Sequence, residues 1–137
     1  MNDVLAAVTS EPLKPSTVDE FVWGAEAGAV VSFQGVVRDH DGGRSVLSLD
    51  YRAHPQAEIF LRQCCEEIAE ATGLRVAAQH RVGSLAIGEL ALIAAVAAPH
   101  RPEAFAACSH LVEIIKKRVP IWKRQHYSAG ATEWVGL

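Results

Sequence analysis

The spacing of apolar and polar positions predicts a strand, a short helix and a second strand at the start of the chain. Residues 1–15 mix short apolar runs with two prolines, a pattern that favours an edge strand and a turn over a helix. Residues 16–20 carry overlapping capping-box signals, which predict a short helix that ends near Gly24. The run 29–38 is rich in β-branched and aromatic residues and is typical of a strand with an irregularity at Gly35.

A hairpin and a long helix are expected next. The turn residues of 39–45 precede a stretch, 47–53, in which apolar and polar residues alternate, so the strands around this turn are expected to form a hairpin. After Pro55 the apolar residues follow helical spacing until Gly73, which is a natural helix C-cap. These apolar positions are Ala57, Phe60, Leu61, Cys64 and Ile68.

The second half of the chain predicts two further strands and a second long helix. Residues 75–82 and 89–98 are typical of strands, and the segment 83–88 is expected to be the turn between them. A helix is expected from about Pro102, with a cationic last turn, and Pro120 ends it. The stripe that this helix is expected to bury consists of Phe105, Cys108, Val112 and Ile115.

A turn near Gly130 and a short strand at 132–135 complete the predicted elements. The mixture of hairpins with two long helices argues for an α+β fold and against a doubly wound parallel sheet. Because 137 residues is a usual size for one domain, we expect a single domain over residues 1–137.

Composition places the chain among ordinary globular proteins, since 50% of its residues are hydrophobic and 21% are charged. The longest apolar stretch, residues 90–99, is about half as long as a membrane span, and the N-terminus lacks a leader-like pattern. We therefore expect a cytoplasmic protein without a membrane partner. Cys64, Cys65 and Cys108 are an odd number without CxxC spacing, which indicates reduced thiols.

Positive charge is concentrated in one segment of a chain whose net charge is −3. Residues 116–124 hold five of the thirteen basic residues and no acid, so the remainder carries eight basic against sixteen acidic residues, a formal charge of −8. This asymmetry indicates a local site for an anion.

Several common chemistries have no motif in the sequence. The six histidines show no zinc-binding spacing, so no metal site is expected, and there is no GxSxG, P-loop or GxGxxG. A candidate anion site consists of Arg38, His100, Arg101, Lys116 and Lys123. The His-Arg pair stands at a predicted helix N-terminus, where the dipole favours negative charge, and clustered cations lower the pKa of a lysine.

These residues also have structural interpretations. Residues 116–118 could simply complement the dipole of the helix C-terminus, Arg38 could be a solvated strand end, and His100 an ordinary turn residue. Cys64 and Cys108 lie on apolar stripes, which favours buried packing over catalysis. The basic segment with Trp122 could also bind RNA or DNA, but the acidic remainder argues against a broad footprint, so no nucleic-acid partner is expected.

Three blocks of the sequence resemble one known family. They are GAVVSFQGVVRDHDGGRSVLSLDY (28–51), HRVGSLAIGE (80–89), and HRPEAFAAC (100–108) together with KKRVPIWKR (116–124). This combination resembles the large, catalytic subunits of molybdopterin synthase, the MoaE family, from about Glu11 to Val135. The resemblance implies an α/β-hammerhead-like α+β domain with an antiparallel sheet, hairpins and two main helices.

The family's activity implies a sulfurtransferase of molybdenum cofactor biosynthesis. A small ubiquitin-like partner inserts its thiocarboxylated Gly-Gly tail into a pocket, and sulfur passes to cyclic pyranopterin monophosphate (precursor Z) to build the molybdopterin dithiolene. The resemblance also implies a homodimer of large subunits with one small subunit at each end, a heterotetramer. No bound cofactor is expected, because the product is itself the cofactor's precursor.

Carried over to this sequence, the resemblance implies Lys116 and Lys123 as catalytic lysines. Lys116 would act as general base or transient nucleophile, while Lys123 and Arg101 would stabilise negative charge and Arg38 and His100 would orient the phosphate. The implied substrate-binding residues are Val36, Val37, Arg38, His100, Arg101, Lys116, Lys123, Arg124 and Gln125.

The sequence departs from the family at three places. The family usually has an acid where this chain has Gln125, often a methionine where it has Gln56, and commonly a longer tail than the one that ends at Leu137. Pocket closure and dimer contacts are the properties that these departures affect. A scaffold that has lost activity is an alternative, although the intact Lys116, Lys123 and Arg101 argue against it.

Overall fold

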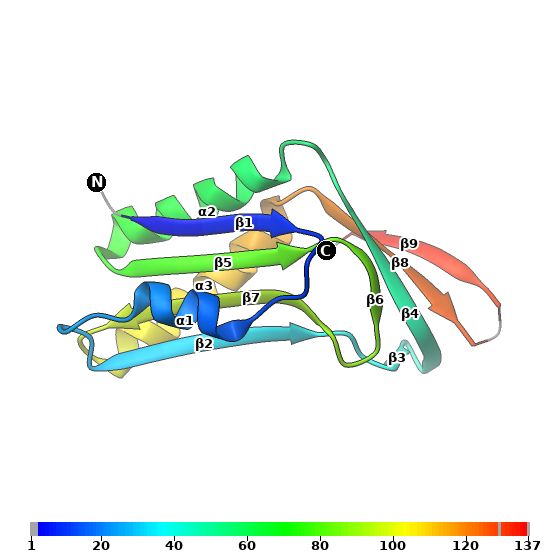
Figure 1. Ribbon diagram of the computed structural model, residues 1–137, viewed down its shortest axis with the longest axis horizontal. Coiled ribbons are helices and arrows are strands. Elements are labelled where there is room, and N and C mark those ends of the chain that lie inside the picture. The colour runs from blue at the N-terminus through cyan, green and yellow to red at the C-terminus, as the bar shows by residue number, and fades with distance from the viewer. Residues whose placement is uncertain (1–2, 129, 137) are drawn as a thin grey trace.

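The computed structural model describes residues 3–128 and 130–136, and its centre is a four-stranded sheet (Figure 1). The strand order is β1 (Val4–Thr9), β5 (Arg75–Arg81), β7 (Leu90–Ala98) and β2 (Ala29–Val36). The pairing of β1 with β5 is parallel and the other two pairings are antiparallel. The first strand therefore lies at an edge, as predicted for residues 1–15, of which the first two lie outside the described part.

Helices cover both faces of this sheet. The long helices α2 (Ala57–Thr72) and α3 (Arg101–Arg118) pack on one face, and the short α1 (Pro15–Val22) packs on the other. Successive residues of β7 alternate between the two faces, so Ala94 and Val96 contact the long helices while Ile93 and Ala95 contact α1. This double burial explains why 90–98 is a continuous apolar run rather than an alternating one.

A second sheet lies at one end of the first (Figure 1). Its strands are β3 (His40–Asp41), β4 (Arg44–Ala53), β8 (Ile121–Tyr127) and β9 (Thr132–Gly136), and β6 (Gly83–Ala86) also pairs with β4. The predicted α+β class with two main helices is confirmed, as are the bulge after Gly35 and the C-cap at Gly73, whose φ is 72°.

Several local predictions were wrong. The strand 29–38 forms no hairpin with 47–53: β2 pairs with β7, and β4 forms a hairpin only with the two-residue β3. The capping box is absent, because the N-cap of α1 is Lys14, without a side-chain bond, and Pro15 begins the helix. The turn predicted at 83–88 contains β6.

Three side chains on the predicted apolar faces are exposed, and the first is Phe60 of α2, at 38%. Phe105 of α3 is 62% exposed, whereas the other three residues of the predicted stripe are buried. Leu47 is 61% exposed because a register shift between Val46 and Ser48 interrupts the alternation of β4. All three cysteines are buried free thiols, which confirms the packing prediction for Cys64 and Cys108.

No helix in residues 3–128 and 130–136 combines the length and the apolar character that crossing a membrane requires.

Candidate active site

A cavity of about 330 Å³ opens where the two sheets meet. Its walls come from β2 and the residues after it, from β4, β5, β7 and β8, and from the last turn of α3. Apolar walls are formed by Phe33, Val36, Ala91 and Leu92, and polar groups by Arg38, Tyr51, His80, Lys116 and Lys123. Segments far apart in the sequence therefore bring three cations to one cavity.

The backbone explains how each cation reaches the cavity. Arg38 follows the bulge at which β2 leaves its partner β7. Lys116 lies in the last turn of α3, where a cation complements the helix dipole, and Val119 then ends the helix before Pro120. Lys123 stands opposite Tyr51 in the β4–β8 pairing, so both side chains project from the same face of the second sheet.

Lys123 is partly buried among these groups. Burial lowers the pKa of its ammonium group, and the charges of Lys116 and Arg38 lower it further, while the carboxylate of Asp41 opposes the change. A lysine with a lowered pKa has a larger fraction in the neutral amine form at neutral pH. The pKa of Lys123 is thus lowered, as the sequence predicted for a lysine among other cations. Burial, rather than the neighbouring charges, is the largest cause of this change.

His80 is a polar residue of the cavity that the sequence patterns did not single out. It is 2% exposed, its Nδ1 lies 2.8 Å from the carbonyl oxygen of Arg81, and its ring meets that of Tyr51 edge-on at 5.2 Å. A carbonyl can only accept, so Nδ1 carries the proton and Nε2 is a hydrogen-bond acceptor. Burial lowers the pKa of His80 to about 4, and the nearby charge of Lys116 acts in the same direction.

The predicted phosphate pair lies elsewhere. His100 is the N-cap residue of α3 and Arg101 its first residue, and they line a separate hollow with Gly28 and Pro99. Lys116 is the fifteenth residue after Arg101 along the helix, about 22 Å away at the usual rise per residue. One copy of the chain therefore does not bring the pair into the cavity with Lys116.

Of the other predicted substrate-binding residues, Val36 lines the cavity, whereas Val37, Arg124 and Gln125 do not. Val36 is half exposed, whereas Val37 is buried in the core. Arg124 alternates with Lys123 along β8, faces the opposite side, lies 3.4 Å from Asp50 and stacks over Trp134. Gln125 is buried, and its amide donates to the carboxylate of Asp41 at 2.6 Å.

Comparison with known proteins identifies the family. The family model described as MoaE protein matches residues 8–118. Molybdopterin synthase catalytic subunit 1 of Mycobacterium tuberculosis is 44% identical over 133 residues, which cover 94% of this chain and 88% of the relative.

Solved structures agree with the sequence comparison. The molybdopterin synthase structure from Staphylococcus aureus has a TM-score of 0.90 at 36% identity, over 96% of this chain and 97% of the other. A chain in the complex of subunits 1 and 2 of molybdopterin-converting factor from Helicobacter pylori has a TM-score of 0.71 at 17% identity, over 97% and 87%, and shares the fold. From its fold and its sequence, the chain belongs to the MoaE family.

Proposed function

We propose that this chain is the catalytic subunit of a molybdopterin synthase. It would transfer sulfur from the thiocarboxylated C-terminus of a small ubiquitin-like subunit to precursor Z, forming the molybdopterin dithiolene. The observation that carries the proposal is the cavity that joins Arg38, Lys116 and Lys123 in a chain of the MoaE family. Both substrates are anions, which a cationic cavity with apolar walls would attract and partly desolvate.

The residue roles follow from chemistry. Lys116 is the proposed general base or transient nucleophile, and the ammonium form of Lys123 stabilises negative charge that develops in the cavity. Arg38 orients the phosphate of the pterin. Val36 contacts the substrate at the rim of the cavity. Val37 and Gln125 are buried and Arg124 faces away, so these three residues would support the site without touching the substrate.

A second copy of the chain would complete the site. His100 and Arg101 are exposed and stand a helix length away from Lys116, so in a two-fold dimer they could reach the cavity of the partner copy. There Arg101 would bind the phosphate bidentately and His100 would help orient it. A homodimer with one small subunit at each end would therefore reconcile the predicted role of His100 and Arg101 with their distance from Lys116.

The small subunit is the proposed sulfur-carrying partner. A narrow cavity among several elements suits an extended C-terminal tail better than a globular surface. In the Helicobacter pylori complex, subunits 1 and 2 of molybdopterin-converting factor form one assembly, which supports a two-subunit enzyme. We expect the reaction to take place in the cytoplasm, without nucleic acid, membrane or bound cofactor.

Conversion of precursor Z to molybdopterin tests the proposal. The purified chain is mixed with the thiocarboxylated small subunit, and wild type is compared with Lys116→Ala and with the matched control Lys117→Ala. Lys117 is the exposed neighbour of Lys116 and does not line the cavity. Wild type and Lys117→Ala should form product, and Lys116→Ala should lose at least about a hundredfold in rate, as general acid–base groups do.

Two results would count against the proposal. A wild-type protein that binds the small subunit but makes no product would indicate a scaffold that has lost activity. Near-normal turnover by Lys116→Ala would remove the lysine from the mechanism while leaving the sulfur-transfer function in place.

A further inference from the structure

Asp41 is an acid beside two of the three cations of the cavity, Arg38 and Lys123. Its Oδ1 lies 3.6 Å from the guanidinium of Arg38, three residues earlier in the chain. Its charge also reaches Lys123, the partly buried lysine on β8. A single carboxylate in the short β3 hairpin thus interacts with two cations that come from different elements.

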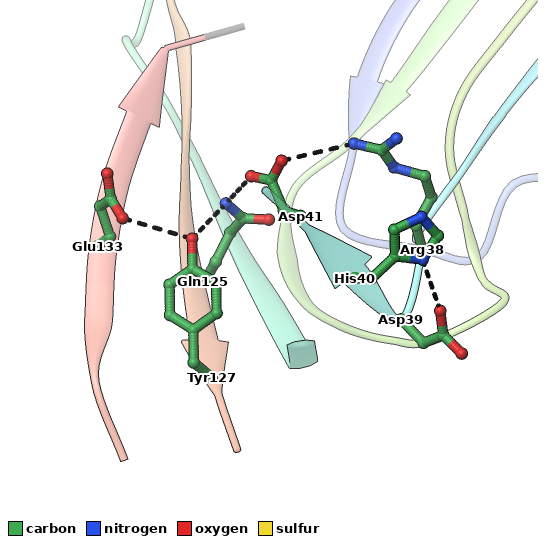
Figure 2. A network of polar contacts seen from close by, with 7 residues as sticks. All are labelled: Arg38, Asp39, His40, Asp41, Gln125, Tyr127 and Glu133. Carbon is green, nitrogen blue, oxygen red and sulfur yellow. Dashed lines mark hydrogen bonds and ion pairs between the residues drawn. The ribbon is translucent and has the colours of Figure 1, made fainter. Parts of the chain in front are cut away.

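Gln125 holds the other oxygen of this carboxylate. Its Nε2 donates to Oδ2 of Asp41 at 2.6 Å and approaches the hydroxyl of Tyr127 at 3.0 Å (Figure 2). Gln125 is 3% exposed, so little water competes for this hydrogen bond. The bond is the largest cause that lowers the pKa of Asp41, with Lys123 and Arg38 acting in the same direction, so the carboxylate is charged at neutral pH.

The contacts continue away from the cavity. The hydroxyl of Tyr127 lies 3.4 Å from the carboxylate of Glu133 on β9 (Figure 2). Arg44 contacts the ring of Tyr127 and also the carboxylate of Glu133. Gln125 and Tyr127 alternate with outward-facing residues of β8, on the same side of the strand as Lys123. The strand that carries Lys123 is therefore tied to the hairpin that carries Asp41.

We propose that Asp41 is a positioning residue for sulfur transfer: it orients Arg38 and balances the charge of Lys123, and it requires an uncharged amide at residue 125. This inference rests on the proposed function for its catalytic consequence only. A glutamate at residue 125 would place a second carboxylate at hydrogen-bond distance from Asp41. The two acids would then compete for one proton or move apart, and both cations would lose a fixed partner.

A charge swap tests the proposal. Asp41→Asn keeps the shape and a hydrogen bond to Gln125 but removes the charge, and Gln125→Glu adds a charge without removing one. The double variant Asp41→Asn with Gln125→Glu restores one acid and one amide in contact, with the net charge of wild type. Each single variant should lower kcat on the order of tenfold, and the double variant should recover to within about threefold of wild type, because contacting residues couple non-additively.

The second measurement is the pKa of Lys123, obtained from a ¹³C NMR titration of the lysine side chains. The signal of Lys123 is assigned as the one that is missing from the spectrum of Lys123→Arg. Because the carboxylate of Asp41 raises this pKa, Asp41→Asn should lower it, and the double variant should bring it back toward the wild-type value. A residue that only supported the fold would change stability without moving this pKa.

Asp39→Asn is the matched control. Asp39 lies in the same loop, is exposed, and contacts His40 at 2.9 Å. Its removal should leave both kcat and the pKa of Lys123 unchanged.

The outcomes separate the inference from the proposed function. Absence of product with wild type would overturn the proposed function, while the titration would still decide whether Asp41 and Gln125 control Lys123. Unchanged kcat and an unchanged pKa of Lys123 in Asp41→Asn would overturn the inference. A double variant no better than the worse single variant would overturn the requirement for an amide at residue 125.

Discussion

The buried imidazole of His80 makes stability depend on pH in a definite direction. An unfolded histidine binds its proton near pH 6.5, whereas folded His80 does so only near pH 4. Between these values the unfolded chain holds more protons, so the free energy of unfolding falls as the pH falls. We expect this one group to cost about 2 kcal/mol between pH 7 and pH 5.

Urea unfolding at the two pH values checks this expectation. His80→Gln cannot titrate and should lose less stability on acidification than wild type, by about the amount given above. His110→Gln, which replaces an exposed histidine of α3, should follow wild type. Equal losses for wild type and His80→Gln would show that His80 is not held neutral by the fold.

The sequence predicted the cations of the cavity better than it predicted the polar residues that surround them. Arg38, Lys116 and Lys123 meet in one cavity, as a group of cations in an acidic chain suggested. His80 and Asp41 were missed although both stand in blocks that resemble the family. Their contributions depend on a carbonyl oxygen and on a buried amide that only the folded backbone brings to them.

At the scale of elements, the residue just before β2, Gly28, packs against Pro99, between β7 and α3, without room for a side chain. A Cβ at Gly28 would lie 2.2 Å from the carbonyl oxygen of Pro99, and both are backbone positions that cannot turn away. Gly28→Ala should therefore lower the free energy of unfolding by about 1–3 kcal/mol. Because Pro99 precedes His100, the same shift would move the N-terminus of α3.

Gly24→Ala is the control for this substitution. There the nearest atoms belong to the carboxylate of Glu26, at 3.2 Å, and this flexible side chain can rotate away. Denaturant unfolding of the two variants should place Gly28→Ala well below Gly24→Ala. Equal stabilities would mean that Gly28 and Pro99 can separate at no cost.

Local patterns predicted the helices well and the strand pairing poorly. The helices α2 and α3 and the C-cap Gly73 follow from periodicity within a few turns of chain. The partner of β2 is β7, about 60 residues later, and no local signal specifies such a pairing. The exposure of Phe105 was missed for the same reason, since periodicity does not say how far a covered stripe extends.

At the scale of the whole molecule, α3 carries the two halves of the predicted site at its opposite ends. If a dimer brings them together, a chain with Lys116→Ala and a chain with Arg101→Ala damage different halves of each site. Each variant alone should be nearly inactive. A mixed dimer would contain one site with both substitutions and one intact site, so an equal mixture should regain about a quarter of wild-type activity.

Refolding the two variants together and measuring molybdopterin formation checks this expectation. Refolding them separately and mixing afterwards, without exchange of subunits, is the control and should give no recovery. No recovery after joint refolding, with mixed dimers demonstrated, would mean that Arg101 and Lys116 do not act in sites shared between copies.

The buried cysteines have a consequence for the path of sulfur. Burial raises the pKa of Cys65 to about 12 and that of Cys108 to about 11, and it raises the pKa of Cys64 as well. An accessible thiolate would attack the carbonyl carbon of the thiocarboxylate, forming a thioester with the small subunit and releasing the sulfur to be transferred as hydrogen sulfide. Because all three thiols are protonated and buried, they do not react with the thiocarboxylate. Oxidants that inactivate thiol enzymes would likewise find no exposed cysteine to attack.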